Sequence, residues 1–314
     1  MRSEKEVVVN IGDKIGSGTS GSIAVLGAGK MGSSLLAAIT KRSDSRFMTV
    51  RATVKHAHRA ASVSKQLGLS IGIDNANAVR DARIVLICTK PLHVQSVLQE
   101  IRAVLRDDGL IVSIASAVTT QAIEAALGRR LAVVRAMPNM ACRIGKGMTA
   151  LCAGRFATAE HLAEAAELFA LMGRTAEVEE SMMDAVTGLS ASGPAFIYTI
   201  IEALAEGGVR VGLARDLATT LAAQATLGAA SMVLETGMHP AILKSEVTTP
   251  GGCTVEGLLE LEEGSIRATL IRAIDTTTRK ASTLARPSAN GAEFDNWLKR
   301  EPAGAAEAAD GRPV

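Results

Sequence analysis

The sequence predicts an α/β fold: a doubly wound, mostly parallel sheet, followed by an all-helical domain. Short apolar segments alternate with helix-like stretches as far as residue 178, some of these segments are apolar almost throughout, and no strand signal follows. Such alternation favours a parallel sheet covered by helices on both faces, whose inner strands face no water. With 314 residues, the chain is long enough for two domains.

The elements are expected in this order. A strand at Ser22–Leu26 leads through a glycine-rich turn into a helix at Lys30–Thr40. Further strands are expected at 48–54, 84–88, 110–114, 131–135, 148–151 and 175–178, with a helix at 159–172. The second half has helix patterns at 193–206, 214–235, 255–262 and 265–284. The most apolar segments, 84–88 and 110–114, are predicted to be central strands.

The change of pattern near Glu180 predicts a domain boundary. The expected organisation is an irregular leader at 1–21, a sheet domain at 22–180, a helical domain at 181–300 and a disordered tail at 301–314. The helix that starts at Gly193 is apolar nearly all round, which fits either a subunit interface or the central helix of a monomeric bundle.

Composition argues against several classes of partner. A net charge of +2, one Trp, one Tyr and five Phe give neither a basic field nor stacking platforms, so no nucleic acid is expected. The apolar run at 195–201 stops at Glu202, short of the roughly 20 residues that cross a bilayer, so no membrane partner is expected. The N-terminus lacks the pattern of a secretory signal, which predicts a cytoplasmic protein.

The cysteine and histidine residues predict no metal site. The four cysteines lie far apart in the sequence and have no C-x-x-C spacing: Cys88, Cys142, Cys152 and Cys253. This distribution predicts reduced, mostly buried thiols rather than disulfides or zinc ligands. The five histidines form no metal-ligand pattern either.

A glycine motif follows the first strand and opens the first helix. It matches G-x-G-x-x-G and consists of Gly27, Ala28, Gly29, Lys30, Met31 and Gly32. In that context the first glycine permits a sharp turn, the second lets the backbone approach a pyrophosphate, and the third lets helix and strand pack closely. The free N–H groups of the helix N-terminus favour the anion. The motif predicts a Rossmann-type domain that binds a dinucleotide, against the alternative of a purely structural turn.

The end of the second strand predicts NADPH as the preferred cofactor, with NADH possible. An NAD site usually has an acidic residue there for the ribose hydroxyls, but no acid occurs between Asp44 and Asp74. The strand is followed instead by a basic cluster made of Lys55, His56, His58 and Arg59, which suits a 2′-phosphate. The alternative is a solvated basic start of a helix.

Two other strand ends carry polar residues. Thr89, Lys90 and Pro91 follow the strand at 84–88, at the sheet edge where ligands bind, so Lys90 is either a site contact or an ordinary exposed lysine. Pro138 and Asn139 follow the strand at 131–135, where a site role competes with plain turn chemistry.

The helical half has two stretches that combine glycine, proline and hydroxyl residues, 190–195 and 247–254. Local chemistry reads both as helix starts. Together with the other motifs, they resemble the pyrroline-5-carboxylate reductase family over roughly 22–284. The family's glycine motif, V-K-P, M-P-N, G-S-G-P-A and S-P-G-G-x-T are similar to the segments 27–32, 89–91, 137–139, 191–195 and 249–254. Asn75 stands where a family asparagine contacts the cofactor.

The resemblance implies reduction of the cyclic imine 1-pyrroline-5-carboxylate to proline by NAD(P)H, the last step of proline biosynthesis. It also implies a homo-oligomer held by the helical domain, with each site completed across the dimer. The residues that it implies for the substrate carboxylate are Ser192, Thr249, Gly251, Gly252 and Cys253. Thr254 would hydrogen-bond the ring nitrogen, and because its hydroxyl is a very weak acid, it would relay or orient a proton. The alternative for Thr254 is a helix N-cap.

Four departures from the family pattern leave alternatives open: Ala191 and Thr249 replace glycine and serine, Ser116-Ala117 replaces Ala-Gly, and Thr89 replaces valine. Such changes in bulk alter discrimination by about 1–3 kcal/mol, so a specialised reductase of a substituted or six-membered cyclic imine is the main alternative. A non-catalytic NADPH-binding regulator is a second. The 3-hydroxyacid dehydrogenases are disfavoured, because their helix lysine has no counterpart after Gly193.

Overall fold

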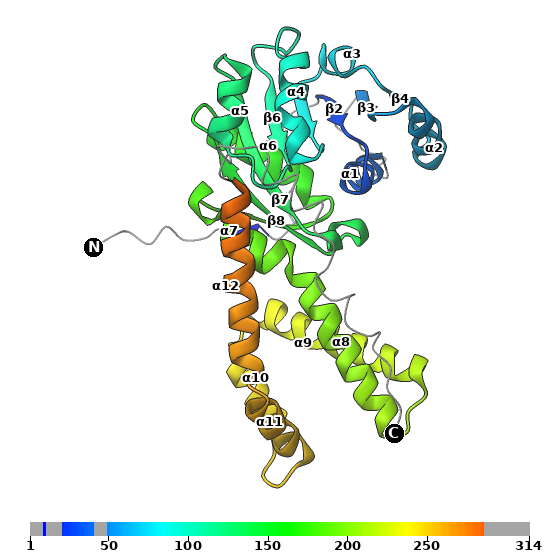
Figure 1. The fold of residues 1–314 in the computed structure, drawn as a ribbon, viewed down its shortest axis with the longest axis vertical. Helices are drawn as coiled ribbons and strands as arrows, with labels where there is room; N and C mark the ends of the chain where they lie inside the picture. The colour runs from blue at the N-terminus through cyan, green and yellow to red at the C-terminus, as the bar shows by residue number, and fades with distance from the viewer. Residues whose placement is uncertain (1–8, 11–20, 41–48, 286–314) are drawn as a thin grey trace, which may run out of the picture.

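The computed structural model describes residues 9–10, 21–40 and 49–285. A sheet with helices on both faces forms one part of the molecule, and an arm of helices extends away from it (Figure 1). Among the described residues, nine strands form one sheet in the order β1-β9-β8-β7-β6-β5-β2-β3-β4.

The strands confirm the predicted doubly wound sheet. Their bounds are β1 Val9–Asn10, β2 Ser22–Leu26, β3 Thr49–Thr53, β4 Ile71–Gly72, β5 Ile84–Ile87, β6 Leu110–Ser113, β7 Ala132–Pro138, β8 Gly147–Ala153 and β9 Gly173–Glu177. From β4 through β7 all neighbours are parallel, in the Rossmann order. The pairs β7–β8 and β1–β9 are antiparallel. The mostly parallel sheet therefore positions the C-terminal ends of β2, β5 and β6 along one edge.

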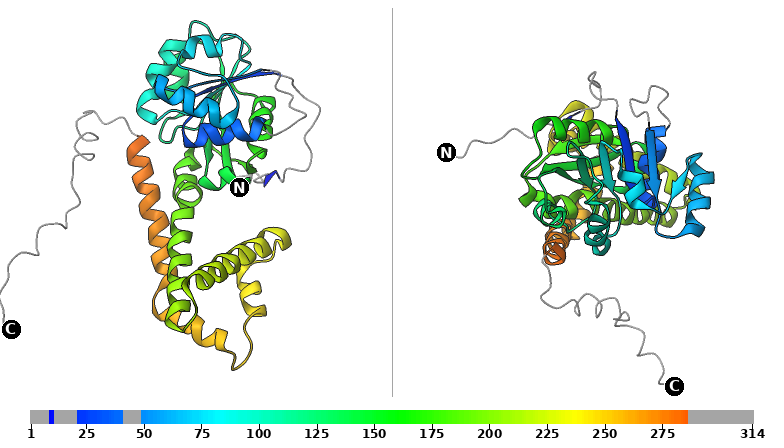
Figure 2. Two further views of the ribbon diagram at one scale, coloured as in Figure 1. Left: turned by 90° about the vertical axis from the view of Figure 1, so that its right-hand side faces the viewer. Right: turned by 90° about the horizontal axis from the view of Figure 1, so that it is seen from above.

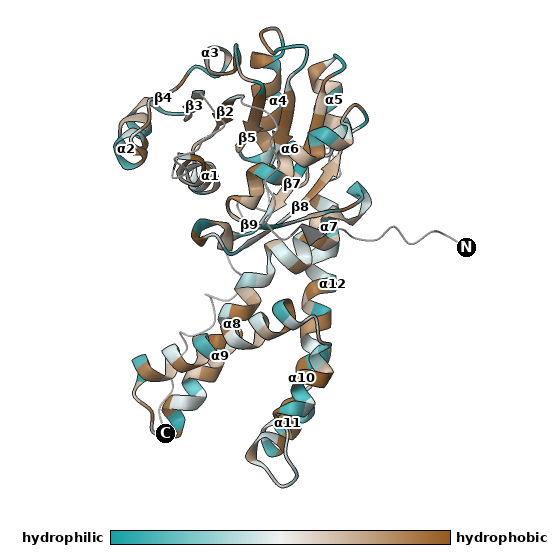
Figure 3. Cartoon of the chain, turned by 180° about the vertical axis from the view of Figure 1, so that it is seen from behind, coloured by the Kyte–Doolittle hydropathy of each residue, from teal (hydrophilic) through white to brown (hydrophobic). Residues whose placement is uncertain are grey.

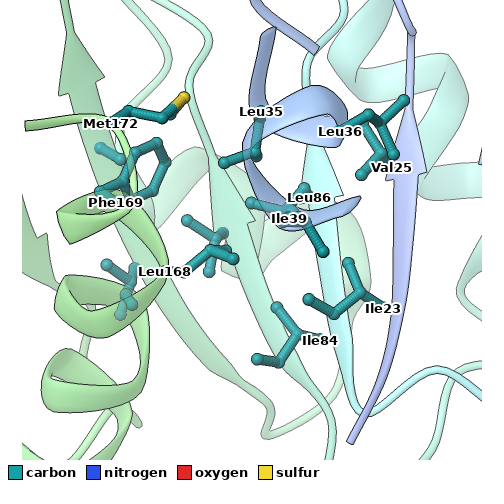
Figure 4. Packing of buried hydrophobic residues seen from close by; sticks show 14 of the residues in the cluster. Ile23, Val25, Leu35, Leu36, Ile39, Ile84, Leu86, Leu168, Phe169 and Met172 are labelled. Carbon is teal, nitrogen blue, oxygen red and sulfur yellow. The ribbon is translucent and has the colours of Figure 1, made fainter. Parts of the chain in front are cut away.

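Helices cover both faces because successive strand residues point to opposite sides. On one face of the sheet lie α1 (Lys30–Thr40), α2 (Ala57–Leu67) and α6 (Ala159–Ala170). On the second face lie α3 (Asn75–Val79), α4 (Pro91–Ile101) and α5 (Thr120–Leu127). Figure 4 shows the first face, where Leu35 and Ile39 of α1 lie over Ile84 and Leu86 of β5. All residues of β5 and β6 are buried, so both faces of these two strands are covered, as their continuous apolar runs predicted.

The arm begins after β9. It contains α7 (Met183–Val186), a π-helical turn (Thr187–Ala191), α8 (Gly193–Arg210), α9 (Arg215–Thr236), α10 (Pro240–Glu246), α11 (Cys253–Glu263) and α12 (Ile266–Ala285). The helices α8 and α9 pack on each other, and α12 packs back on α7 and the π-helical turn. The four helices predicted for this half are confirmed as α8, α9, α11 and α12.

Several elements differ from the expectations. The leader expected to be irregular contains β1, whose Val9 and Asn10 pair with β9; a strand of two residues is stabilised by its partner, so its own sequence carries little signal. The short β4 and α10 were not expected, and β7 continues to Pro138 rather than ending at residue 135. The expected disordered tail at 301–314 lies outside the described residues. The predicted domain bounds remain a prediction.

The arm exposes much more apolar surface than the sheet. Its own buried cluster consists of Ala205, Ala218 and Ala222, whereas Leu204, Leu221 and other large side chains are at least half exposed. Figure 3 shows brown, apolar faces along its helices. Among the described residues, two helical segments are long and apolar enough to span a membrane by length and composition alone, Glu180–Arg210 and Arg215–Thr236. No such segment was expected from the sequence, because the apolar run at 195–201 stops at Glu202. Surface of this kind also marks a protein interface.

Candidate functional site

The glycine turn is built as the motif predicts. Gly27 has φ +96° and follows β2, and the N–H groups of Gly27 and Ala28 both donate to the carbonyl of Thr53, at 3.1 and 2.8 Å. A Cβ on Gly32 would lie 2.5 Å from the Gly27 carbonyl oxygen, so only glycine lets α1 approach β2 this closely. A Cβ on Gly29 would meet nothing within 4 Å, which leaves open space in front of the helix N-terminus.

A cleft of about 730 Å³ lies at this edge of the sheet. Its walls bring together predicted site residues from five separate elements and loops: Gly27, Ala28, Gly29, Lys55, Arg59, Asn75, Thr89 and Lys90. Four others of the predicted set lie elsewhere. Lys30 lines a neighbouring groove along α1, Met31 packs against the core, Gly32 packs on Gly27, and Pro91 is the first residue of α4. Gly32 and Met31 therefore shape the turn without facing the cleft.

Asn75 bridges two walls of the cleft. Its side-chain Oδ1 accepts a hydrogen bond from Thr53 Oγ1 at 2.6 Å, and its Nδ2 donates to Glu100 Oε2 at 2.9 Å. Thr53 is the last residue of β3 and is buried, so Asn75 links the end of β3 to α4. The amide is thereby held in one orientation beside the cleft.

The wall formed by α4 was missed by the sequence reasoning. His93, Ser96, Val97 and Glu100 all line the cleft, and they come from one helix. Their i, i+3, i+4, i+7 spacing puts them on one helical face, which is the signal that could have found them. Glu100 also places a carboxylate in a cleft for which only basic residues, Lys55, Arg59 and Lys90, were expected.

The cleft fits a dinucleotide. Thr89 Oγ1 is buried and has no hydrogen-bond partner among the described residues, so a hydroxyl donor is available at the cleft wall. The helix N-terminus of α1 and the open space before Gly29 suit a pyrophosphate. Burial raises the pKa of the neighbouring Cys88 thiol to about 12, so this cysteine stays protonated and is no nucleophile.

The predicted substrate residues lie on the arm. Gly251 has φ +71°, the N–H of Gly252 donates to the Thr249 carbonyl at 2.9 Å, and Gly252 caps the N-terminus of α11. A Cβ on Gly252 would collide with the Thr249 hydroxyl, so the tight loop requires glycine. Thr254 is the second residue of α11, so the alternative that Thr254 is the N-cap is wrong. Its exposed side chain stands beside the free amides of the helix start.

Within one chain, this loop and the cofactor cleft are far apart. In Figures 1 and 2, α11 lies at the distal end of the arm and the cleft residues lie in the sheet domain. The nearer part of the arm is the π-helical turn, which leads to Ser192 at the start of α8. π-Helical turns often occur at functional sites. The loop at 249–254 therefore does not line the cleft of its own chain.

Two of the departures from the family pattern have a visible structural setting. Ala191 packs against the cluster that contains Met137, Cys152 and Met183, so its methyl group is accommodated by the junction between sheet and arm. Ala117 has φ +63°, a left-handed conformation that glycine adopts without strain. Asn139 serves the turn after β7, because its Oδ1 accepts from the N–H groups of Ala141 and Met148.

These features define an NAD(P)H-dependent oxidoreductase with a Rossmann domain and a helical arm. Residues 22–117 match the family model described as NADP oxidoreductase coenzyme F420-dependent, and residues 180–284 match the model described as pyrroline-5-carboxylate reductase dimerisation.

The protein is 40% identical to a pyrroline-5-carboxylate reductase of Methanosarcina acetivorans, over 84% of this chain and 98% of that relative. An enzyme of the same description from Arabidopsis thaliana is 36% identical, over 84% of this chain and 95% of its own length. The solved pyrroline-5-carboxylate reductase of Coxiella burnetii superposes with a TM-score of 0.79 at 30% identity, covering 86% of this chain and 100% of that one. This chain belongs to the pyrroline-5-carboxylate reductase family.

Proposed function

We propose that this protein reduces 1-pyrroline-5-carboxylate to L-proline with NAD(P)H. The observation that carries the proposal is the combination, in one chain of this family, of a cleft that fits a dinucleotide at the C-terminal edge of the sheet and a glycine-rich loop at 249–254 that leads into the N-terminus of α11. A solved relative from Plasmodium falciparum, 27% identical with a TM-score of 0.76, is described with NADP bound.

On the cofactor side, the start of α1 holds the pyrophosphate, and Lys55 and Arg59 neutralise a 2′-phosphate. The basic cluster therefore favours NADPH over NADH. Asn75, Thr89 and Lys90 complete the cleft wall, with the Thr89 hydroxyl as a free donor. When bound, the cofactor supplies the hydride that reduces the carbon of the C=N bond.

On the substrate side, the amides of Gly251 and Cys253, with the hydroxyls of Ser192 and Thr249, hold the carboxylate. The Gly252 amide, which was also expected to bind it, is already donated to the Thr249 carbonyl, so Gly252 shapes the loop instead. Thr254 orients or relays a proton from water to the ring nitrogen, because an imine accepts hydride much better when its nitrogen is protonated or hydrogen-bonded. The loop comes from the second subunit of a dimer formed by the arms. Binding of both the cofactor and the substrate at the cleft holds the reacting carbon in place.

The apolar surface of the arm is the interface of the homo-oligomer. The match of residues 180–284 to the dimerisation model supports this assembly, and burial in it accounts for helices that are long and apolar without being buried in one chain. We place the assembled enzyme in the cytoplasm.

The proposal is tested by following NADPH oxidation with purified protein and 1-pyrroline-5-carboxylate, then with its six-membered and methylated analogues. Turnover that is fastest with the parent imine is the expected result. Turnover with an analogue alone would overturn the assignment in favour of a specialised reductase. The same assay with NADH tests the cofactor preference, which a lower KM for NADH than for NADPH would contradict.

A further inference from the structure

A partly buried charged cluster lies where the sheet meets the arm. It consists of Arg135 on β7, Glu180 at the start of the arm and Thr120 at the start of α5. Arg135 is 2% exposed, and its Nη1 lies 3.4 Å from Glu180 Oε1. Its Nε and Nη2 are buried without a partner among the described residues. A buried cation is costly unless it is paired, so the Glu180 carboxylate is held at this position.

The same carboxylate also fixes the start of α5. Its Oε1 accepts a hydrogen bond from the backbone N–H of Thr120 at 2.7 Å, and its Oε2 accepts one from Thr120 Oγ1 at 2.5 Å. A carboxylate at a helix N-terminus is further favoured by the helix dipole. One side chain of the arm therefore connects β7 to the N-terminus of α5.

The contact secures the loop that runs from β6 to α5. This loop begins beside the cofactor cleft, because the N–H of Ile114 donates to the carbonyl of Ile87 at 3.0 Å and the next residues along β5 are Cys88 and Thr89, which line the cleft. Three residues before Thr120, the loop contains Ala117 at φ +63°. A non-glycine residue in that conformation persists only where its surroundings enforce it.

We propose that Glu180 is a positioning residue: anchored by Arg135, it holds the β6–α5 loop beside the cofactor cleft and fixes this loop relative to the arm. The kinetic consequence rests on the proposed reaction, in which the cleft edge and the substrate loop must meet in one geometry. Loss of the contact lets the loop relax without removing any group that holds the pyrophosphate. Turnover should therefore fall while cofactor affinity is kept.

The test compares Glu180→Ala and Glu180→Gln with Glu179→Ala, which alters the exposed neighbouring carboxylate. Glu180→Ala should lower kcat by about 10- to 100-fold, the effect of a small misplacement, with the KM for NADPH within about threefold of wild type. Glu180→Gln keeps an oxygen that accepts from Thr120 and should recover kcat to within about threefold of wild type. An equal loss in both variants would tie the defect to the unpaired Arg135 charge and overturn the positioning role.

A second measurement does not depend on turnover. Hydrogen exchange of the amides at 114–122 should be faster in Glu180→Ala than in Glu179→Ala, with the glycine turn at 27–32 unchanged. Thr120→Val leaves both charges in place and should show the same change to a smaller degree, so the test survives if Glu180→Ala does not fold. Wild-type exchange and wild-type kcat in Thr120→Val would overturn the inference. Failure of the wild-type enzyme to reduce the parent imine would instead refute the proposed function, and the exchange result would still decide the inference.

Discussion

At the scale of single residues, the glycines of the cofactor turn have different roles, one in folding and another in cofactor binding. Gly32 is required by contact with the Gly27 carbonyl, whereas Gly29 faces open space. We expect Gly32→Ala to destabilise the sheet domain by about 1–3 kcal/mol, because backbone atoms must shift to admit the methyl group.

Gly29→Ala is the matched comparison. It should unfold at the wild-type temperature but bind NADPH about tenfold or more weakly, because its methyl group occupies the space that a pyrophosphate needs. Thermal unfolding and a fluorescence titration with NADPH check both variants. Equal stability of the two proteins would contradict this division of roles.

Thr254 is the residue on which the proposed chemistry depends most. Thr254→Ala should lower kcat by about 100-fold, the usual effect of removing one donor that stabilises developing charge. Thr254→Ser restores the hydroxyl and should recover most of the activity. Steady-state kinetics with the parent imine measure both variants. Full activity in Thr254→Ala would exclude a role for the hydroxyl in proton transfer.

The cysteines should differ sharply in reactivity. Burial raises the pKa of Cys88 and of Cys152 to about 12, with the Glu180 carboxylate adding to the effect at Cys152. Since a raised pKa keeps the thiolate scarce at every pH well below 12, neither thiol should react with iodoacetamide at pH 8. Cys253 is exposed and should be modified first, with loss of activity that Cys253→Ser prevents. Mass spectrometry of the labelled peptides measures the order, and early labelling of Cys88 would contradict it.

At the scale of elements, the β6–α5 loop contains a strained alanine. A left-handed conformation costs a non-glycine residue roughly 1–2 kcal/mol of stability. Replacement by glycine removes this strain but loses about 0.4–1 kcal/mol, because glycine has more conformational entropy in the unfolded chain. Ala117→Gly should therefore stabilise the protein and raise the unfolding midpoint by a few degrees, about 2–4 °C per kcal/mol for a domain of this size. Ala115→Gly, at a buried residue without a positive φ, should lower it. A shift of both variants in the same direction would contradict the assignment of strain.

The elements that the sequence predicted are those whose own residues carry the signal. β2 and α1 were predicted with the bounds that the structure has, because an apolar run, a glycine turn and an amphipathic stretch follow one another without interruption. β1, β4 and α10 were missed, since each is too short for a periodicity and depends on its neighbours. In the same way, the α4 wall of the cleft was missed because its residues are separated from the glycine motif in sequence and only the fold brings them together.

At the scale of the whole molecule, the arm makes activity depend on assembly. Leu221 is half exposed on α9, in the region that matches the dimerisation model. Leu221→Glu should favour monomers, because a charge would be buried at the interface. Turnover should be lost, since the substrate loop then has no second chain to serve.

NADPH binding should persist in the Leu221→Glu monomer, because the cleft lies within one chain. Analytical ultracentrifugation and a cofactor titration measure these two effects. Gln99→Glu, on the exposed face of α4, is the control and should stay assembled and active. A monomer with wild-type turnover would refute a site shared between subunits.

The sequence alone determined the alternation of the longer strands and helices, the glycine turn and the basic residues after β3, because each depends on adjacent residues whose chemistry acts locally. It also indicated the family through five short motifs. Only the tertiary structure decided which residues face the cleft, where Glu100 meets Asn75, and how Arg135 and Glu180 tie the sheet to the arm. Those contacts join residues that are 25 to 45 positions apart, so they exist only after the chain has folded.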